Sequence, residues 1–439
     1  KKFLTAVITG LMFTASFAFA AEGDEAQIGT TTYATFEEAL AEAQSGDEIE
    51  ILTDISLETT QNIDKSLTIS GEYTITSSAK KAFTIDKADE DAEELIEVTF
   101  KDVYIIDTAY SGRCIDTRDG YITLNLDYVW LESTSAGNNQ TLNMGGYDSN
   151  GITYNIVDSF IYGGDAGYAL SLWCTSEVNI DASYLEGYCA LYFKDGSEGS
   201  TVNVINESVL ASCACEDFIF GTVVFDVGDV TLNIVDSGVL AIGSDGEYKQ
   251  YAFLWSSYGD DVTGNVINIS GDSAIAVDEG QEIAATGTEN TISISGVTTN
   301  VEIPEEFWAE DFVQVDNGDG TYSVCNHENT EVVDDKEATC TEEGYTGDTV
   351  CSDCGAVVEE GEVIEVDPEN HTFVDGVCAC GEEEEVETTP EATPEATPEA
   401  TPDDADKNQP ETGDNGIVVF AVLAVVALAG VVFAKKNAR

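Results

Sequence analysis

The sequence is poor in positive charge and in histidine. Its 439 residues include 16 Lys and Arg against 85 Asp and Glu, and its two histidines are His327 and His371. So acidic a chain repels nucleic acid and anionic lipid, and a polyanionic ligand would need bound cations. The chain before residue 325 has no histidine, which argues against the His-dependent polysaccharide hydrolases. We therefore expect no nucleic-acid partner, and we also expect no organic cofactor.

Long apolar runs are confined to the two ends of the chain. Near the start, two lysines precede the apolar run Phe3–Phe19, which ends at a small-x-small cleavage pattern, so residues 1–20 are predicted to be a secretory signal peptide. Near the end, the 18 uncharged residues Ile417–Ala434 are long enough to cross a bilayer core of about 30 Å. Without residues 1–20 and 413–439 the chain keeps 11 basic and 84 acidic residues, a net charge of −73.

A short motif stands directly before the second apolar run. It reads Q-P-E-T-G, and a basic tail, Lys435–Arg439, follows the run. This layout resembles the cell-wall sorting signal of Gram-positive surface proteins, in which a sortase cuts an L-P-x-T-G motif and joins its Thr to peptidoglycan. The resemblance implies sortase and peptidoglycan as partners, with membrane contact only before cleavage. Because the motif begins with Gln409 rather than Leu, the class of sortase is left open. The alternative is a tail-anchored membrane protein. The motif residues are Gln409, Pro410, Glu411, Thr412 and Gly413.

The body of the chain carries a loose internal repeat. An apolar residue, an Asn and a second apolar residue recur six times, with the Asn positions 24 to 35 residues apart. A repeat of this length with β-branched strands is typical of a solenoid. Stacked coils would place the Asn side chains about 4.8 Å apart, which predicts a hydrogen-bonded ladder; a ligand-binding stripe is the alternative. The Asn residues are Asn125, Asn155, Asn179, Asn203, Asn233 and Asn268.

The repeat and the segment before it resemble the right-handed parallel β-helices of pectate-lyase-like and bacterial surface proteins. We expect an all-β fold in which residues 21–53 are an N-terminal cap and residues 54–324 are the β-helix with a closing hairpin. Thr35 and Glu38 form a capping box, which predicts a short helix to about Gln44 with Phe36, Ala39, Leu40 and Ala43 as its apolar stripe. Phe307, Trp308 and Phe312 are expected to plug the far end. A β-sandwich is the alternative fold.

Residues 325–381 collect six of the eleven cysteines and both histidines. The pattern C-x-H followed by C-x-x-C-G resembles the zinc-ribbon-like repeats of clostridial-type surface proteins, which implies structural zinc held by two sets of ligands. The first set is Cys325, His327, Cys351 and Cys354, and the second is Cys340, His371, Cys378 and Cys380. Three disulfides are the alternative in an exported chain. The other five cysteines are expected as buried thiols in the β-helix, and they are Cys114, Cys174, Cys189, Cys213 and Cys215.

An acidic, proline-containing segment joins this module to the sorting signal. Residues 382–408 contain T-P-E-A repeats with Pro390, Pro394, Pro398 and Pro402 four apart. Proline at this spacing, with charge between, favours an extended and solvated stalk. The stalk ends where the sorting signal, residues 409–439, begins.

The best candidates for catalysis lie in the segment G-R-C-I-D-T-R-D-G. Its residues Arg113, Asp116, Arg118 and Asp119 would pair a base with calcium-bound substrate, as in polysaccharide lyases. The alternative is a surface turn in which these charges neutralise one another. We predict that this alternative holds and that the protein is not an enzyme, although calcium remains a candidate cofactor.

The function predicted from the sequence is adhesion or binding at the surface of a Gram-positive bacterium. The ligand would be a glycan or a protein on a host or neighbouring cell, and exposed aromatic residues would contact it. A calcium-dependent polysaccharide lyase and a passive surface coat are the alternatives. The aromatic candidates in the middle and later coils are Tyr162, Tyr168, Trp173, Tyr184, Tyr188, Tyr192, Trp255 and Tyr258.

Overall fold

The computed structural model describes residues 23–86, 95–118, 121–145, 150–212, 220–241, 249–259, 261–352, 354–375 and 377–383. The predicted signal peptide 1–20, the predicted stalk from residue 384 onward and the predicted sorting signal 409–439 lie outside these residues. No helix within the described ranges has the length and apolar character needed to span a bilayer. The chain divides into two units, one formed by residues up to Glu310 with Gly318–Tyr322, the other by Asp311–Asn317 and residues from Ser323 onward.

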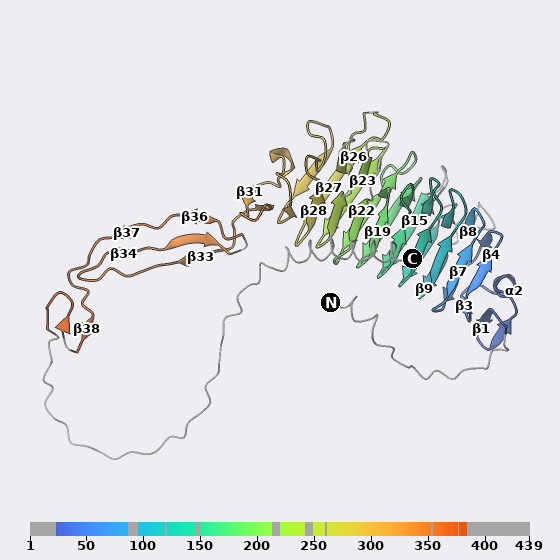
Figure 1. The fold of residues 1–439 in the computed structure, drawn as a ribbon, viewed down its shortest axis with the longest axis horizontal. Helices are drawn as coiled ribbons and strands as arrows, with labels where there is room; N and C mark the ends of the chain where they lie inside the picture. Colours follow the sequence, from blue (N-terminus) through green and yellow to red (C-terminus); the bar gives the residue numbers. More distant parts are fainter. Residues whose placement is uncertain are drawn as a thin grey trace, which may run out of the picture. The chain divides into compact units, whose positions relative to one another are not determined.

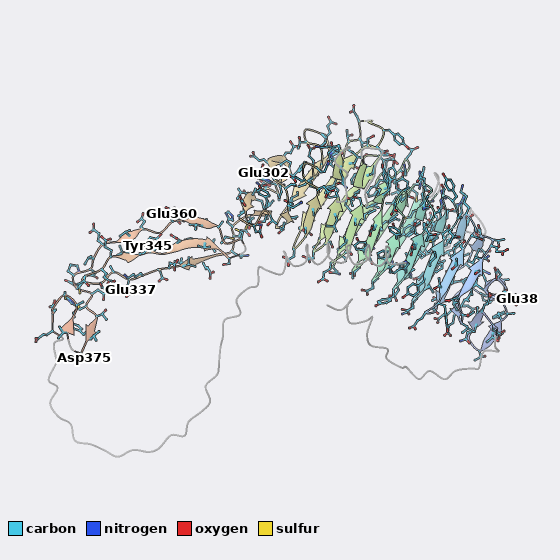
Figure 2. The ribbon with its side chains drawn as sticks, viewed as in Figure 1. Glu38, Glu302, Glu337, Tyr345, Glu360 and Asp375 are labelled. Atoms are coloured by element: carbon cyan, nitrogen blue, oxygen red, sulfur yellow. The ribbon has the colours of Figure 1, made fainter. Side chains whose placement is uncertain are left out.

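The predicted capping helix is present near the start of the first unit, after two short strands. Helix α2 (Phe36–Glu42) starts at Thr35, whose hydroxyl accepts a hydrogen bond from the backbone N–H of Glu38 at 3.2 Å. Glu38 is labelled in Figure 2. The predicted apolar stripe is buried, and the ring of Phe36 packs edge-on against Phe83 at 5.9 Å. The helix therefore covers the end of the solenoid core.

Three long sheets follow, which we call A, B and C. Sheet A consists, in order, of β2 (Thr31–Tyr33), β1 (Ala26–Ile28), β3 (Asp47–Ile51), β6 (Leu67–Ser70), β9 (Ile96–Lys101), β12 (Ile122–Asp127), β15 (Asn150–Val157), β18 (Thr175–Asp181), β21 (Thr201–Ile205), β24 (Thr231–Val235), β27 (Val266–Ser270) and β29 (Thr291–Ile294). Sheet C consists of β5 (Gln61–Ile63), β8 (Lys81–Ile85), β11 (Arg113–Thr117), β14 (Gln140–Met144), β17 (Tyr168–Leu172), β20 (Cys189–Phe193), β23 (Phe220–Phe225) and β26 (Gln250–Trp255).

Sheet B runs through the same coils. Within the first unit it consists of β4 (Ile55–Leu57), β7 (Thr74–Ser77), β10 (Tyr104–Asp107), β13 (Trp130–Ser133), β16 (Phe160–Tyr162), β19 (Tyr184–Gly187), β22 (Val209–Ser212), β25 (Gly238–Ala241), β28 (Ala274–Val277) and β30 (Thr298–Thr299). From β3 onward the chain visits sheets A, B and C in turn, and these strands pair in parallel with their counterparts one coil away, whereas β1 pairs antiparallel with β2 and β3 (Figure 1). This is a parallel β-helix, as predicted, and the β-sandwich alternative is wrong because the strands of a sandwich pair antiparallel.

The predicted asparagine ladder runs along the outer face of sheet A. The six Asn residues are register partners, and the side-chain amide of each one after Asn125 donates to the Oδ1 of the Asn in the preceding coil. The five bonds from Asn155 to Asn268 measure 2.9 to 3.0 Å. Because the amides satisfy one another, the column is a structural ladder that fixes the register of the coils.

A tight turn between sheets A and B uses one residue in the left-handed region in most coils. Asp102, Asp158 and Asp236 take this conformation with φ of 46 to 55°. The buried Ser of the repeat follows within two residues, and its hydroxyl accepts from a backbone N–H of the preceding coil, as Ser183 does from Ser159 at 3.0 Å. The Asn and Ser of the repeat therefore specify two parallel hydrogen-bond columns around one turn.

The far end of the β-helix is closed by a short 3-10 helix, η1 (Glu305–Phe307). Phe307 is buried, and Trp308 forms a bridge with Ile294 of the last strand of sheet A. Phe312, also predicted to plug this end, belongs to the second unit. Of the five cysteines expected in the β-helix core, Cys114, Cys174 and Cys189 are buried and form no disulfide, while Cys213 and Cys215 lie outside the described residues.

The second unit is built from short antiparallel strands. After the hairpin strands β31 (Val313–Asp316) and β32 (Tyr322–Cys325) come a three-stranded sheet and two hairpins. The sheet holds β33 (Thr330–Val333), β35 (Asp348–Cys351) and β36 (Val357–Glu359), and the hairpins are β34 (Gly344–Tyr345) with β37 (Val363–Ile364) and β38 (Phe373–Val374) with β39 (Val377–Cys378).

Candidate metal centres and a cationic sheet face

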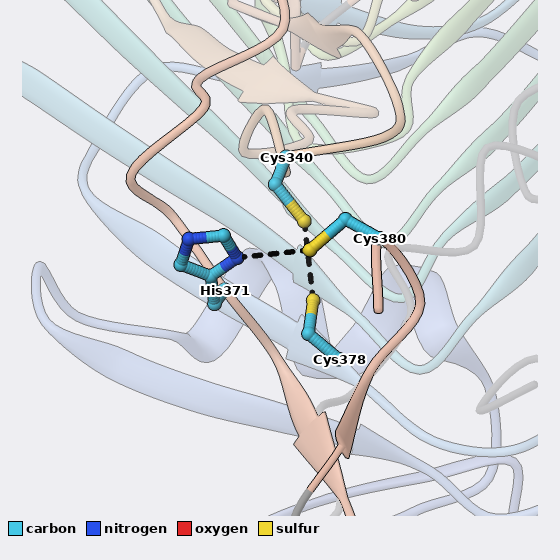
Figure 3. A group of neighbouring side chains, drawn as sticks. All are labelled: Cys340, His371, Cys378 and Cys380. Carbon is cyan, nitrogen blue, oxygen red and sulfur yellow. Dashed lines mark hydrogen bonds between the residues drawn. The ribbon is translucent and has the colours of Figure 1, made fainter. Parts of the chain in front are cut away.

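One group of four side chains has the composition of a tetrahedral metal site. The ligand atoms of Cys340, His371, Cys378 and Cys380 all lie within 4.8 Å of one another (Figure 3). The β38–β39 hairpin brings the last three residues together, and Cys340 comes from the loop before β34. The Sγ atoms of Cys340 and Cys378 are 3.1 Å apart, and Nδ1 of His371 is 3.3 Å from Sγ of Cys380. This is the second predicted ligand set.

The surroundings orient His371 for binding through Nδ1. Its other ring nitrogen, Nε2, is 3.0 Å from a carboxylate oxygen of Glu382. A proton on Nε2 that is shared with Glu382 leaves the lone pair of Nδ1 directed at the cysteines, the arrangement found around bound metal ions. The pKa of Cys378 is lowered to about 6, mainly because the backbone N–H of Cys380 donates a hydrogen bond to it. The lowered pKa favours the thiolate form of Cys378.

A second group contains the three cysteines of the other predicted set. Cys325 ends β32, Cys351 ends β35, and the two Sγ atoms are 3.6 Å apart, with Cys354 within the same 4.8 Å group. The predicted fourth ligand, His327, is not part of this group. Its backbone N–H donates to Sγ of Cys325 at 3.4 Å, and its buried Nε2 has no hydrogen-bond partner among the described residues. A buried imidazole nitrogen without a hydrogen-bond partner has the chemistry of a metal ligand, but His327 lies outside the group of three thiols.

The second unit has almost no apolar core to stabilise it. In its described part, the buried apolar side chains after β31 are Val324, Ala338 and three of the cysteines themselves, while Val332, Val363 and Val374 are exposed. No disulfide joins any of the six cysteines in the described part of this unit. Sulfur and imidazole donors, a shortage of buried apolar area and the orphaned nitrogen together fit two metal-binding sites.

In the β-helix, the candidate catalytic segment forms a buried ion cluster on the outer face of sheet C. Asp116 is fully buried, and three cations converge on it: Lys81, Arg113 at 2.6 Å and Arg118 at 3.0 Å. Asn143 donates to the same carboxylate at 2.7 Å. Burial alone would raise the pKa of Asp116, but the neighbouring cations hold this pKa below its ordinary value.

This geometry leaves Asp116 no free oxygen for calcium. Each carboxylate oxygen already accepts two donors, and Asn143 extends the network to the buried hydroxyl of Ser171 at 2.8 Å. The segment is a strand, β11, rather than the surface turn of the alternative, although its charges do neutralise one another as that alternative predicts. Asp119, the fourth candidate, lies outside the described residues.

Further along the same face, the structure gathers a lysine and several aromatic rings that sequence reasoning had not joined. Nζ of Lys194 lies 3.3 Å from the ring centroid of Tyr192, within 6 Å of the rings of Tyr168, Trp173 and Tyr258, and 3.6 Å from Asp226. Burial lowers the pKa of Lys194, and Asp226 opposes this effect. The aromatic density of this region was visible in the sequence, but the partnership with Lys194 depends on the coil register.

The predicted aromatic residues lie on or next to two different sheets. Tyr168, Trp173, Tyr192 and Tyr258 surround Lys194 at sheet C, and Tyr188 packs with the buried cluster of Cys189 and Tyr192. Tyr162 and Tyr184 belong to sheet B. Trp255 lies on β26 of sheet C, with its Nε1 donating to the carbonyl of Ala285 at 3.1 Å. Comparison of the whole chain with protein-family models, with curated proteins and with solved structures gives no match in any of the three.

Proposed function

We propose that the protein is a cell-wall-anchored surface adhesin of a Gram-positive bacterium and that the outer face of sheet C binds an acidic glycan. The sorting-signal motif and signal peptide support export and anchoring by sortase. The β-helix would be the binding unit and the Cys/His unit a zinc-stabilised spacer before the stalk. The group of Cys340, His371, Cys378 and Cys380 offers four protein ligands, which would fill a tetrahedral site and leave no open position, so zinc there would be structural.

The distribution of positive charge is the observation that carries the glycan proposal. Residues 23–310 contain eight described Lys and Arg residues, and six of them lie in or next to the strands of sheet C. Three of these six share the single carboxylate of Asp116, which leaves an excess of positive charge there. The six are Lys80, Lys81, Arg113, Arg118, Lys194 and Lys249.

The negative charge of the rest of the surface does not prevent an acidic glycan from binding to this face. A chain with a net charge of −69 repels an acidic polymer at long range, but screening limits that repulsion to roughly 8 Å in physiological salt. At contact distance, the half-exposed guanidinium of Arg118 can pair with a carboxylate or sulfate in a bidentate manner. Tyr258 and the rings around Lys194 offer apolar faces to sugar rings further along the sheet.

The test is affinity for acidic glycans, measured on an array and then in solution. We expect binding to uronate or sulfated glycans and loss of about tenfold in affinity for Arg118→Ala, the cost of one charge-assisted contact. Lys101→Ala is the matched control, because Lys101 is equally exposed and also ion-paired but lies on sheet A. Equal loss in both variants, or no glycan binding at all, would contradict the proposal.

A second candidate, elimination catalysis on a uronic-acid polymer, is favoured by one observation. Nζ of Lys194 lies 3.6 Å from the carboxylate of Asp226, to which the hydroxyl of Tyr192 also donates, so a candidate base and a candidate proton donor lie side by side. Burial lowers the pKa of Lys194. The same glycan samples, monitored for unsaturated product by absorbance, test this candidate. Product that disappears in Lys194→Met would establish the enzyme, and bound glycan without product would remove it.

A further inference from the structure

A column of aromatic rings runs along the outer face of sheet B. Tyr104, Trp130, Phe160 and Tyr184 are register partners in four successive coils, each followed in its strand by a buried aliphatic residue. Their ring centroids are 6.3, 4.1 and 5.4 Å apart, with interplanar angles of 27°, 31° and 6°. Because the rings stack on one another along the column, they present mainly their edges to solvent. Flat stacking of sugar rings, which needs free ring faces, is therefore not favoured here.

Carboxylates flank this column on both sides. Asp102 and Asp158 occupy the turns before Tyr104 and Phe160, and Glu132 and Glu186 lie two residues after Trp130 and Tyr184 on the same outer face. The described strands of sheet B contain no Lys, Arg or His within the first unit. The indole N–H of Trp130 donates to Glu132 at 3.1 Å, which fixes one carboxylate against the ring column.

A tyrosine is also held in a strained position at the border of this face. Tyr128 has φ of 60°, in a turn column whose other non-glycine members are mostly Asp and Asn. An aromatic side chain gains nothing from this backbone conformation, and Tyr128 is 47% exposed, so packing does not explain it. Tyr104 and Tyr73, which belong to adjacent coils and are joined by a backbone hydrogen bond, are exposed to a similar degree.

We propose that this face of sheet B, defined by Tyr104, Tyr128, Trp130, Glu132 and Glu186, binds a segment of a partner protein rich in lysine and arginine. Aromatic rings bordered by carboxylates, on described strands that contain no Lys, Arg or His, complement such side chains in two ways. The charged heads pair with the carboxylates, and the methylene stems pack along the ring edges. Tyr104 is 45% exposed, and its register partner away from Trp130, Thr74, carries no ring, so a cation of the partner would contact the ring of Tyr104 at this end of the column. This surface is separate from the glycan face proposed on sheet C.

The test is fluorescence anisotropy of a labelled peptide of alternating arginine and serine, titrated with the full chain at physiological salt. Tyr104→Ala removes an exposed ring and no charge, so non-specific attraction to an acidic protein stays the same. We expect roughly a fivefold loss of affinity, the worth of one exposed cation–π contact. The matched control is Tyr110→Ala, which removes a more exposed ring between β10 and β11, away from this face, and should bind like the parent.

A second variant guards against misfolding of the first. Glu132→Gln with Glu186→Gln keeps side-chain shape and should also weaken the peptide, whereas the same pair of charges removed at Glu305 and Glu306 should have a smaller effect. Equal affinity for Tyr104→Ala and Tyr110→Ala, or equal binding of a glutamate–serine peptide, would overturn the proposal. Acidic-glycan affinity should not change in Tyr104→Ala. Failure of glycan binding with a preserved peptide effect would remove the proposed function and leave this inference standing.

Discussion

The two units of the chain reach a folded state by different means. In the β-helix, each coil buries aliphatic and aromatic residues between three sheets, and ladders such as Asn155 to Asn125 repeat along the rod. In the Cys/His unit, most valines of the described strands are exposed and the buried residues are chiefly ligands, including Cys351 and Cys378.

The two units must therefore obtain their stability from different sources. A solenoid adds buried apolar area and ladder bonds with every coil, so no single side chain is indispensable. A small unit without a core depends on a few strong bonds, and structural zinc supplies about 10 to 16 kcal/mol in comparable peptides.

Loss of one metal ligand should unfold part of the second unit and leave the first intact. Cys380→Ser and Cys354→Ser each remove a thiolate from one candidate site. We expect each variant to bind one zinc ion where the parent binds two, and to be cleaved by protease between residues 325 and 381. Elemental analysis and mapping of the fragments measure both effects. Unchanged metal content in either variant would show that the group concerned holds no metal.

Asp107 should make the stability of the β-helix depend on pH in the direction opposite to the stability of the Cys/His unit. Burial raises the pKa of Asp107 to about 7, outweighing hydrogen bonds from the backbone of Ala109 and Arg113. Because the pKa in the unfolded chain is about 3.9, the folded state binds this proton more tightly. The associated stability is complete below about pH 4 and is lost as the pH rises to about 7. Metal ligands, in contrast, lose their ion as the pH falls.

Asp107→Asn isolates this contribution, because the amide does not titrate. The difference in unfolding free energy between variant and parent should shift in favour of the variant from pH 4 to pH 7, at about 1.4 kcal/mol per pKa unit. Urea unfolding at several pH values, monitored on the β-helix, measures the slope. A difference that does not vary with pH would refute the raised pKa.

The asparagine ladder should contribute less, and its middle should matter more than its end. Asn179→Ala removes a bond to Asn155 and one from Asn203, leaving two neighbours unsatisfied, which costs about 1 to 3 kcal/mol. Asn268→Ala at the end of the ladder removes one such bond and should cost about half as much. Thermal unfolding compares the two variants. Equal effects would mean that the column does not act as a continuous ladder.

The smallest effect is expected at the helical cap. Thr35→Ala removes the side-chain acceptor of the Glu38 amide and should destabilise the β-helix by about 1 kcal/mol, with no effect on the Cys/His unit. Thr35→Ser keeps the hydroxyl and serves as the control. Chemical unfolding with both variants measures the difference, and a cost in Thr35→Ser equal to that in Thr35→Ala would remove the capping explanation.

Local patterns predicted much of this architecture. Residue spacing predicted the capping helix, the column of six Asn residues and the two groups of cysteines. It could do so because coil length and hairpin pairing determine which residues at a given sequence separation come into contact. Convergence of Lys81 and Arg118 on Asp116 could not be read from the sequence, since Lys81 comes from the coil before Arg113 and its register was unknown. The Lys194 environment was missed for the same reason. His327 was expected beside Cys325 in the metal group, but it lies outside that group and its backbone is left-handed, with φ of 55°.

The most direct test of the difference between the units is differential scanning calorimetry of the whole protein with zinc and with excess chelator. We predict two transitions in zinc, of which the one assigned to residues 323–383 disappears on chelation while the β-helix transition keeps its midpoint. A single transition that shifts as a whole, or two transitions that both ignore the chelator, would contradict the account.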